Sequence, residues 1–111
     1  MNKTLLVVAF ALPMVGCQSA GGAWSVSPAI VELAHDADIF FCESLFVDAD
    51  RDQALKRHHL TARQAGTLAR LAHAKRLEVF HFSPRYDGTP ERLYDEAAAT
   101  YRGELAPDEP D

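Results

Sequence analysis

Residues 39–46 read IFFCESLF, and this stretch decides the fold. Its first four residues are apolar without alternation, which is typical of a strand covered on both faces of a sheet. Glu43 and Ser44 follow directly, so polar chemistry begins where the strand ends. A second run, residues 77–82 (LEVFHF), predicts another strand that ends in the same way, near His81. The carboxyl ends of parallel strands are where open α/β folds bind ligands, so these ends are the candidate site.

Helical patterns separate and flank the two predicted strands. The clearest helix start is at Thr61, which can accept a hydrogen bond from the amide of Gln64 while the Gln64 side chain reaches back. In the last helix, Thr89 is expected as the cap, with Pro90 in the first turn and Gly103 at the end. The predicted helices cover residues 28–37, 48–58, 61–72 and 89–103.

This order of elements predicts an α/β layer of short parallel strands flanked by helices. Only two good strands are apparent in the sequence. A two-stranded parallel sheet has little stability of its own, because its apolar faces and its edges stay uncovered. We therefore expect the chain to be a piece of a larger sheet.

Length and composition exclude several classes of protein. The chain has 111 residues, of which 48% are hydrophobic and 24% charged, which suits one globular domain rather than a disordered, collagen-like or disulfide-rich chain. Eleven Lys and Arg residues stand against sixteen Asp and Glu residues, giving a formal net charge of −5. This balance provides no general attraction to phosphate backbones, so a nucleic-acid contact needs a local basic site.

Residues 1–16 have the features of an export signal. A basic start precedes the apolar run 5–12 (LLVVAFAL), which is too short for an ordinary transmembrane helix. The following residues 14–17 (MVGC) resemble a bacterial lipoprotein signal, in which Cys17 is lipidated after cleavage. This predicts an exported, membrane-anchored lipoprotein with a flexible linker at residues 17–26. A simple secretory signal, or a start placed upstream of a cytoplasmic domain, are the alternatives.

The remaining small features are the second cysteine and the chain end. Cys42 lies in the predicted strand and is interpreted as a small buried hydrophobe. Acylation of Cys17 would exclude an intrachain disulfide. Without acylation, a disulfide between Cys17 and Cys42 is a remaining alternative. Residues 104–111 form an acidic tail that contains two prolines.

Histidines are the candidate chemical groups. His35 and His73 lie near helix ends, where solvent exposure is the simpler expectation. His58 and His59 are adjacent, and adjacent side chains diverge, so at most one of them is expected in a site. His81 follows the second strand, where a structural role and a functional role are equally compatible with its position alone.

Three blocks carry a specific family resemblance. Residues 42–46 (CESLF), 59–65 (HLTARQA) and 81–86 (HFSPRY) resemble the C-terminal segments of ribonuclease Z and its relatives, which have the metallo-β-lactamase fold. The similarity runs from about Ser27 to Gly103. It implies that residues 27–103 form a partial metallo-β-lactamase-like αββα half.

The resemblance also implies roles for individual residues. His81 matches the final zinc-ligand histidine, and His59 matches the histidine beside the scissile phosphate, which transfers a proton or stabilises charge. Glu43 matches the acidic residue of the strand-end block and is taken with His59 as catalytic. Ser83 and Arg85 match the block that follows the zinc ligand and are predicted to hold a substrate phosphate. In the family, two zinc ions activate a hydroxide that attacks a phosphodiester, as at the tRNA 3′ trailer.

The chain departs from the family in its metal ligands. The pattern His-x-His-x-Asp-His is absent, and residues 22–25 (GAWS) stand where the family has Gly-Asp-Thr. Catalytic zinc normally has three protein ligands, so His81 alone cannot hold the zinc expected for the family. The sequence therefore predicts a ribonuclease Z-type phosphodiesterase that is incomplete and inactive alone.

Several partners and one alternative function follow from these expectations. RNA or another phosphodiester is the expected substrate class, a complementary chain or an oligomer would complete the site, and Cys17 would provide a membrane anchor. The alternative function is a non-catalytic membrane-anchored lipoprotein that uses the half-domain as a binding surface. A third possibility is that the chain is a truncated gene product with a marginal fold.

Overall fold

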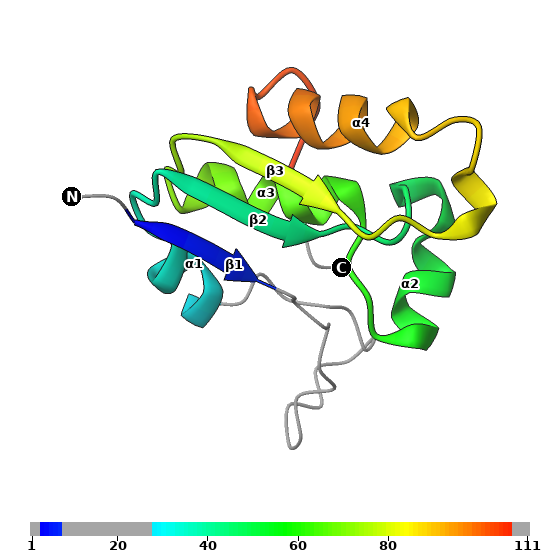
Figure 1. The fold of residues 1–111 in the computed structure, drawn as a ribbon, viewed down its shortest axis with the longest axis horizontal. Coiled ribbons are helices and arrows are strands. Elements are labelled where there is room, and N and C mark those ends of the chain that lie inside the picture. Colours follow the sequence, from blue (N-terminus) through cyan, green and yellow to red (C-terminus); the bar gives the residue numbers. More distant parts are fainter. Residues whose placement is uncertain (1–2, 8–27, 108–111) are drawn as a thin grey trace.

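A three-stranded parallel sheet forms the centre of the molecule in the computed structural model, which describes residues 3–7 and 28–107 (Figure 1). The strands lie in the order β1 (Thr4–Val7), β2 (Ile39–Glu43) and β3 (Leu77–Phe80). The two parallel strands predicted from the sequence are confirmed. The expectation that the sheet has only two strands is wrong, because Thr4–Val7 forms a third strand. The apolar run that begins there has a composition that suits a strand as well as a signal segment.

Helices pack on one side of this sheet. Figure 1 shows α3 behind the strands, α4 alongside β3 and α1 near β1, whereas no helix of the described residues covers the face turned to the viewer. The helices are α1 (Pro28–Ala34), α2 (Arg51–Arg57), α3 (Ala62–Leu71) and α4 (Glu91–Tyr101), with short 3₁₀ turns η1 (Asp48–Asp50) and η2 (Pro84–Tyr86). The sheet is therefore layered on one face only in the described part of the chain.

Left-handed residues end several elements earlier than predicted. Asp36, with a φ of 57°, follows α1; His58, with a φ of 59°, ends α2; and His81, with a φ of 64°, follows β3. Neither a right-handed helix nor a strand can continue through that conformation, which is uncommon for residues other than glycine. The predicted strand 77–82 thus ends at Phe80. The helix predicted from residue 48 is instead η1 followed directly by α2, and no left-handed residue lies between these two elements.

Local capping signals succeed at one helix and fail at another. The reciprocal hydrogen bonds of Thr61 and Gln64 are both present, so the predicted start of α3 is confirmed. In α4 the prediction is wrong by one position, since Pro90 itself occupies the cap position and makes no side-chain capping bond. Gly103 follows α4 with a φ of 80°, as expected for a glycine that ends a helix.

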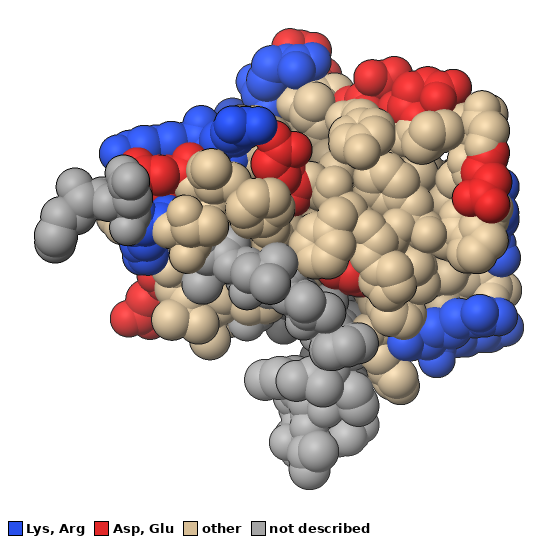
Figure 2. All heavy atoms as spheres, viewed as in Figure 1, with Lys and Arg blue, Asp and Glu red and all other residues tan. Residues whose placement is uncertain are grey.

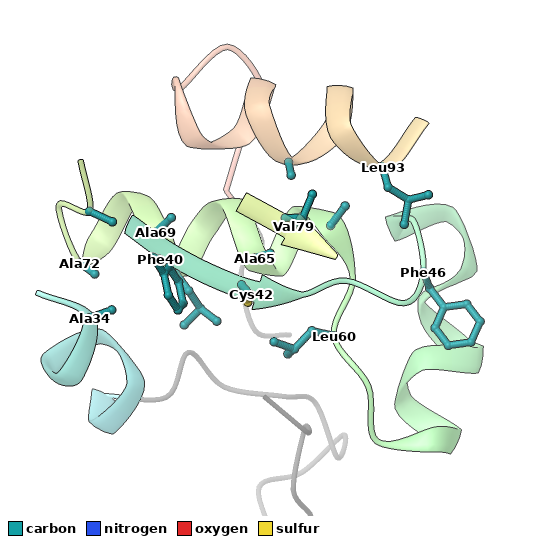
Figure 3. Packing of buried hydrophobic residues seen from close by; sticks show 14 of the residues in the cluster. Ala34, Phe40, Cys42, Phe46, Leu60, Ala65, Ala69, Ala72, Val79 and Leu93 are labelled. Carbon is teal, nitrogen blue, oxygen red and sulfur yellow. The ribbon is translucent and has the colours of Figure 1, made fainter. Parts of the chain in front are cut away.

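The core lies between β2 and α3. Phe40 and Cys42 point from β2 toward the small residues of α3, among them Ala65 and Ala69 (Figure 3). Burial raises the pKa of the Cys42 thiol, and its complete burial agrees with a small hydrophobe. Gly66 brings α3 and α4 together, because a Cβ there would lie 2.6 Å from the carbonyl oxygen of Ala97 and has no room.

The predicted processing site lies outside the described residues. This holds for Cys17, for the cleavage point before it, for the linker 17–26 and for residues 108–111, so those expectations stay predictions. The start of the acidic tail is described, and the amides of Glu104 and Leu105 both donate to the carbonyl oxygen of Ala99. No helix of the described residues combines the length and the apolarity that crossing a membrane requires.

Charged side chains are unevenly distributed over one face of the described part. Figure 2 shows the same face as Figure 1, with Lys, Arg, Asp and Glu at its upper left and around its rim, and uncharged side chains over much of its right-hand part. The formal net charge of −5 is thus not spread evenly over the molecule.

Candidate functional site

The site lies where β2 and β3 end side by side. Parallel pairing sets Glu43 opposite Phe80, so the last residue of β2 lies next to the end of β3, which His81 follows. His59 reaches the same place from the segment between α2 and α3. Residues that are far apart in the sequence are thus brought together by the strand register and by one helix connection.

The carboxyl of Glu43 binds two groups from that segment. Its Oε1 atom lies 2.8 Å from Nδ1 of His59, and its Oε2 atom accepts a hydrogen bond of 3.2 Å from the amide of Leu60. Glu43 is fully buried, whereas the side chain of His59 is 19% exposed. The buried carboxyl therefore fixes the position of a histidine that still reaches solvent.

Burial favours the neutral form of both partners. It raises the pKa of the Glu43 carboxyl to about 7, against the hydrogen bond from Leu60, which lowers it. Burial also lowers the pKa of His59, and the positive charges of His81, Arg57 and His58 act in the same direction. A carboxyl and an imidazole in direct contact, both favoured in their neutral forms, are suited to proton transfer.

His81 is the third member of the cluster. Its Nδ1 atom lies 3.8 Å from Oε1 of Glu43, and its ring centre lies 6.0 Å from that of His59, at an interplanar angle of 79°. The side chain is 54% exposed. The left-handed backbone at His81 turns the chain away from the strand direction, which places the ring over the strand ends.

His58 takes no part in this cluster. It is exposed and occupies the left-handed position that ends α2, with its amide bonded to the carbonyl oxygen of Leu55. The structure therefore directs one of the two adjacent histidines to the site, in agreement with the divergence of neighbouring side chains.

Ser83 and Arg85 lie in the next turn and have local partners. The Ser83 hydroxyl accepts a hydrogen bond of 3.4 Å from the amide of Arg85 and caps η2. The Arg85 guanidinium lies 3.5 Å from the Asp50 carboxylate and 5.3 Å from the centre of the Phe46 ring, with 42% of its side chain exposed. The structure thus connects these two residues to η1 and η2 rather than directly to the Glu43 cluster.

Sequence reasoning missed the contacts that hold this turn. The Tyr86 hydroxyl donates to Asp50 at 2.5 Å and accepts a hydrogen bond of 3.0 Å from the amide of Val47. Tyr86 belongs to the block at residues 81–86, so it was within a recognisable motif, but nothing near Asp50 in the sequence signals that pairing. The hydrogen bond from the Leu60 amide to Glu43 was not predicted either, because nothing in the sequence near either residue signals this contact.

The donor set does not fit a zinc ion. Among residues 3–7 and 28–107, no three His, Cys, Asp or Glu side chains are grouped in a way that could hold a metal. Within the cluster, both oxygens of Glu43 already have protein partners, one of them His59. Zinc requires at least three protein ligands, so His81 has too few companions in the described part of the chain.

The chain is similar in sequence to several known proteins. The chain is 42% identical over 76 residues to a ribonuclease Z of Myxococcus xanthus (strain DK1622), a match that covers 68% of this chain and 25% of that relative. A ribonuclease Z of Chlamydia muridarum (strain MoPn / Nigg) is 36% identical over 108 residues, covering 97% of this chain and 31% of the relative.

Over most of its length, the chain is similar to one part of ribonuclease Z. It spans about a quarter to a third of the length of these curated relatives. The solved structure of the metallo-beta-lactamase fold protein YhfI from Bacillus subtilis superposes with a TM-score of 0.60 over 70% of this chain and 31% of that chain, at 24% identity, which supports the fold alone. No protein-family model matches this chain.

Proposed function

We propose that this ribonuclease Z-like chain contributes a proton-transfer pair, His59 with Glu43, to a phosphodiester-hydrolysing site, and that the chain is inactive alone. The observation that carries the proposal is the 2.8 Å contact between Nδ1 of His59 and the buried Glu43 carboxyl, beside His81. Sequence similarity to ribonuclease Z supports the same chemistry.

The two partners have different roles in this proposal. Contact through Nδ1 turns the opposite ring nitrogen of His59, Nε2, away from Glu43, so Nε2 is the atom that would transfer a proton at a phosphate or stabilise its charge. Glu43 is fully buried and cannot touch a substrate. It is therefore a positioning residue, which sets the tautomer and the orientation of the imidazole.

RNA is the proposed substrate, with the tRNA 3′ trailer as the specific case that the resemblance implies. Arg85 and Ser83 would hold a phosphate beside the site. The Arg85 guanidinium would have to exchange Asp50 for that phosphate, and the pair is 3.5 Å apart with both side chains partly exposed. Such exposed ion pairs contribute about 0–1 kcal/mol, so a phosphate that binds Arg85 at two points can compete.

The remainder of the site would come from another chain or another part of a longer protein. The described residues hold no metal-binding group of three, and residues 8–10 (VAF), which follow β1, contain no ligand side chain. Helices of the described residues cover only one face of the sheet, which supports packing of further structure against the other face (Figure 1). The zinc ions expected for the family would be held by that complementary part.

A chimaeric enzyme tests the proposal. The matching 76-residue segment of the Myxococcus xanthus relative would be replaced by the corresponding part of this chain, and cleavage of a precursor tRNA with a 3′ trailer would be followed with zinc present. We expect the chimaera to cleave the precursor and the isolated chain to be inactive. His59→Ala in the chimaera is expected to lower kcat by about 100-fold or more, the range of a lost proton-transfer group.

His58→Asn is the matched control, because asparagine tolerates the left-handed backbone and His58 lies outside the cluster. It should leave the chimaera active. Two results would contradict the proposal: a chimaera that keeps full activity after His59→Ala, or an isolated chain that hydrolyses a phosphodiester and loses this activity with a chelator and with His81→Ala.

A further inference from the structure

The N-terminal apolar run has a place in the folded sheet. Thr4–Val7 pairs in parallel with β2, with Thr4 opposite Ile39 and Val7 opposite Cys42 (Figure 1). This register makes β1 the neighbour of the strand that carries Glu43 at its end. The same residues begin the apolar run that has the appearance of an export signal.

Hydrogen bonds of Lys3 stabilise the start of this strand. The carbonyl oxygen of Lys3 accepts hydrogen bonds from the amides of Asp38, at 2.7 Å, and Ile39, at 3.4 Å. The amide of Lys3 donates to the Asp38 carboxylate at 2.7 Å, and its ammonium group donates to the carbonyl oxygen of His35 at 2.9 Å. The strand is therefore held by its ladder and by contacts of Lys3, the residue that precedes it.

We propose that Thr4–Val7 is a permanent strand of the folded protein, so that the run at residues 5–12 is retained rather than excised. An apolar strand and the apolar part of a signal have the same composition, which explains the ambiguity of the sequence. The Chlamydia muridarum ribonuclease Z supports retention independently, since its match covers 97% of this chain and hence extends into this run.

Excision would change the sheet directly. Removal of residues 1–16 would take away β1 and expose the edge of β2, including the main-chain groups of Ile39 and Phe41. An exposed strand edge is a site of mispairing and aggregation. The same cleavage would remove Lys3, the hydrogen-bond partner of Asp38.

Intact mass is the first test. The full chain with a C-terminal tag would be produced in a bacterium that exports and lipidates proteins, and its mass would be measured after purification. We expect a mass that includes residues 4–16. A product that begins at Cys17, with or without an attached lipid, would overturn the proposal.

Proline substitution at two consecutive positions is the second test. The Lys3 carbonyl faces β2, and alternation along a strand then directs the amide of Leu5 to β2 and that of Leu6 to the opposite edge. Leu5→Pro should lower the Tm of the purified chain by about 10 °C or more or abolish folding, and Leu6→Pro should have a clearly smaller effect. Tm values unchanged in both variants would contradict a structural strand.

Discussion

The buried carboxyl of Glu43 organises the site at the scale of single residues. Its two oxygens hold the His59 ring and the Leu60 amide, and burial raises its pKa to about 7. Both contacts are of a kind that a neutral side chain can also make. The charge of Glu43 is thus less important for the fold than its hydrogen-bonding capacity.

Two substitutions at Glu43 separate these contributions. Glu43→Ala should lower the free energy of unfolding by about 1–3 kcal/mol, because it leaves the Leu60 amide buried without an acceptor. Glu43→Gln keeps an oxygen for Leu60 and an amide for Nδ1 of His59, so its effect should be much smaller. Urea unfolding at neutral pH measures both, and equal losses in the two variants would show that the negative charge itself is required.

Sequence patterns predicted the members of this cluster better than their conformations. Glu43, His59 and His81 were all identified, because strand ends and motif blocks are local features. The left-handed backbone of His81 and the contact of Arg85 with Asp50 were not predicted. The contact joins η1 to η2, which are more than 30 residues apart in the sequence, so no local pattern encodes it.

At the scale of the elements, Glu96 connects α4 to two helix starts. Its Oε2 atom accepts hydrogen bonds from the amides of Asp48, at 2.9 Å, and Arg63, at 3.1 Å, which lie at the beginnings of η1 and α3. A carboxylate in this position complements the partial positive charge of helix N-termini. The arrangement fixes the beginning of the segment that leads through α2 to His59.

Glu96 makes stability depend on pH. Burial, supported by the negative charge of Asp48, raises its pKa above the ordinary 4.5, against the amide hydrogen bonds and the charge of Arg63. The folded state therefore keeps a proton that the unfolded state has lost, so this group lowers stability as the pH rises from about 4.5 through its folded-state pKa. Glu96→Gln should remove this part of the slope.

Unfolding by urea at a series of pH values tests the assignment. The difference in unfolding free energy between Glu96→Gln and the unsubstituted chain should grow with pH in favour of the variant. Glu96→Ala is the matched variant without an acceptor. It should cost about 1–3 kcal/mol at low pH, because the Asp48 and Arg63 amides lose their partner, and this cost should decrease with rising pH, because this variant also lacks the titrating carboxyl. A constant difference for Glu96→Gln would contradict the pKa assignment.

Elements with local signals were predictable, and those defined by pairing were not. The capping residues Thr61 and Gln64 located the start of α3, because both hydrogen bonds lie within four residues. Strand β1 was missed, since an apolar run has the same appearance in a signal and in a covered strand until its partner is known. The partner, β2, lies more than 30 residues further along the chain.

At the scale of the whole molecule, the described residues form one side of an α/β fold. The chain spans about a quarter to a third of its ribonuclease Z relatives, and helices cover only one face of its sheet in the described part. Glu43 and His59 are in contact at the strand ends, and no metal-binding group of three occurs among the described residues. The expectation of an α/β fold with short parallel strands thus agrees with the structure, whereas the expected number of strands does not.

Zinc binding by the purified full chain tests this account most directly. Native mass spectrometry with a modest excess of zinc would compare the chain with its His81→Ala variant. We predict that neither retains zinc, because His81 lacks companion ligands within the described residues. One or two zinc ions bound per chain, and lost on His81→Ala, would show that the chain holds a complete metal site and would contradict the account.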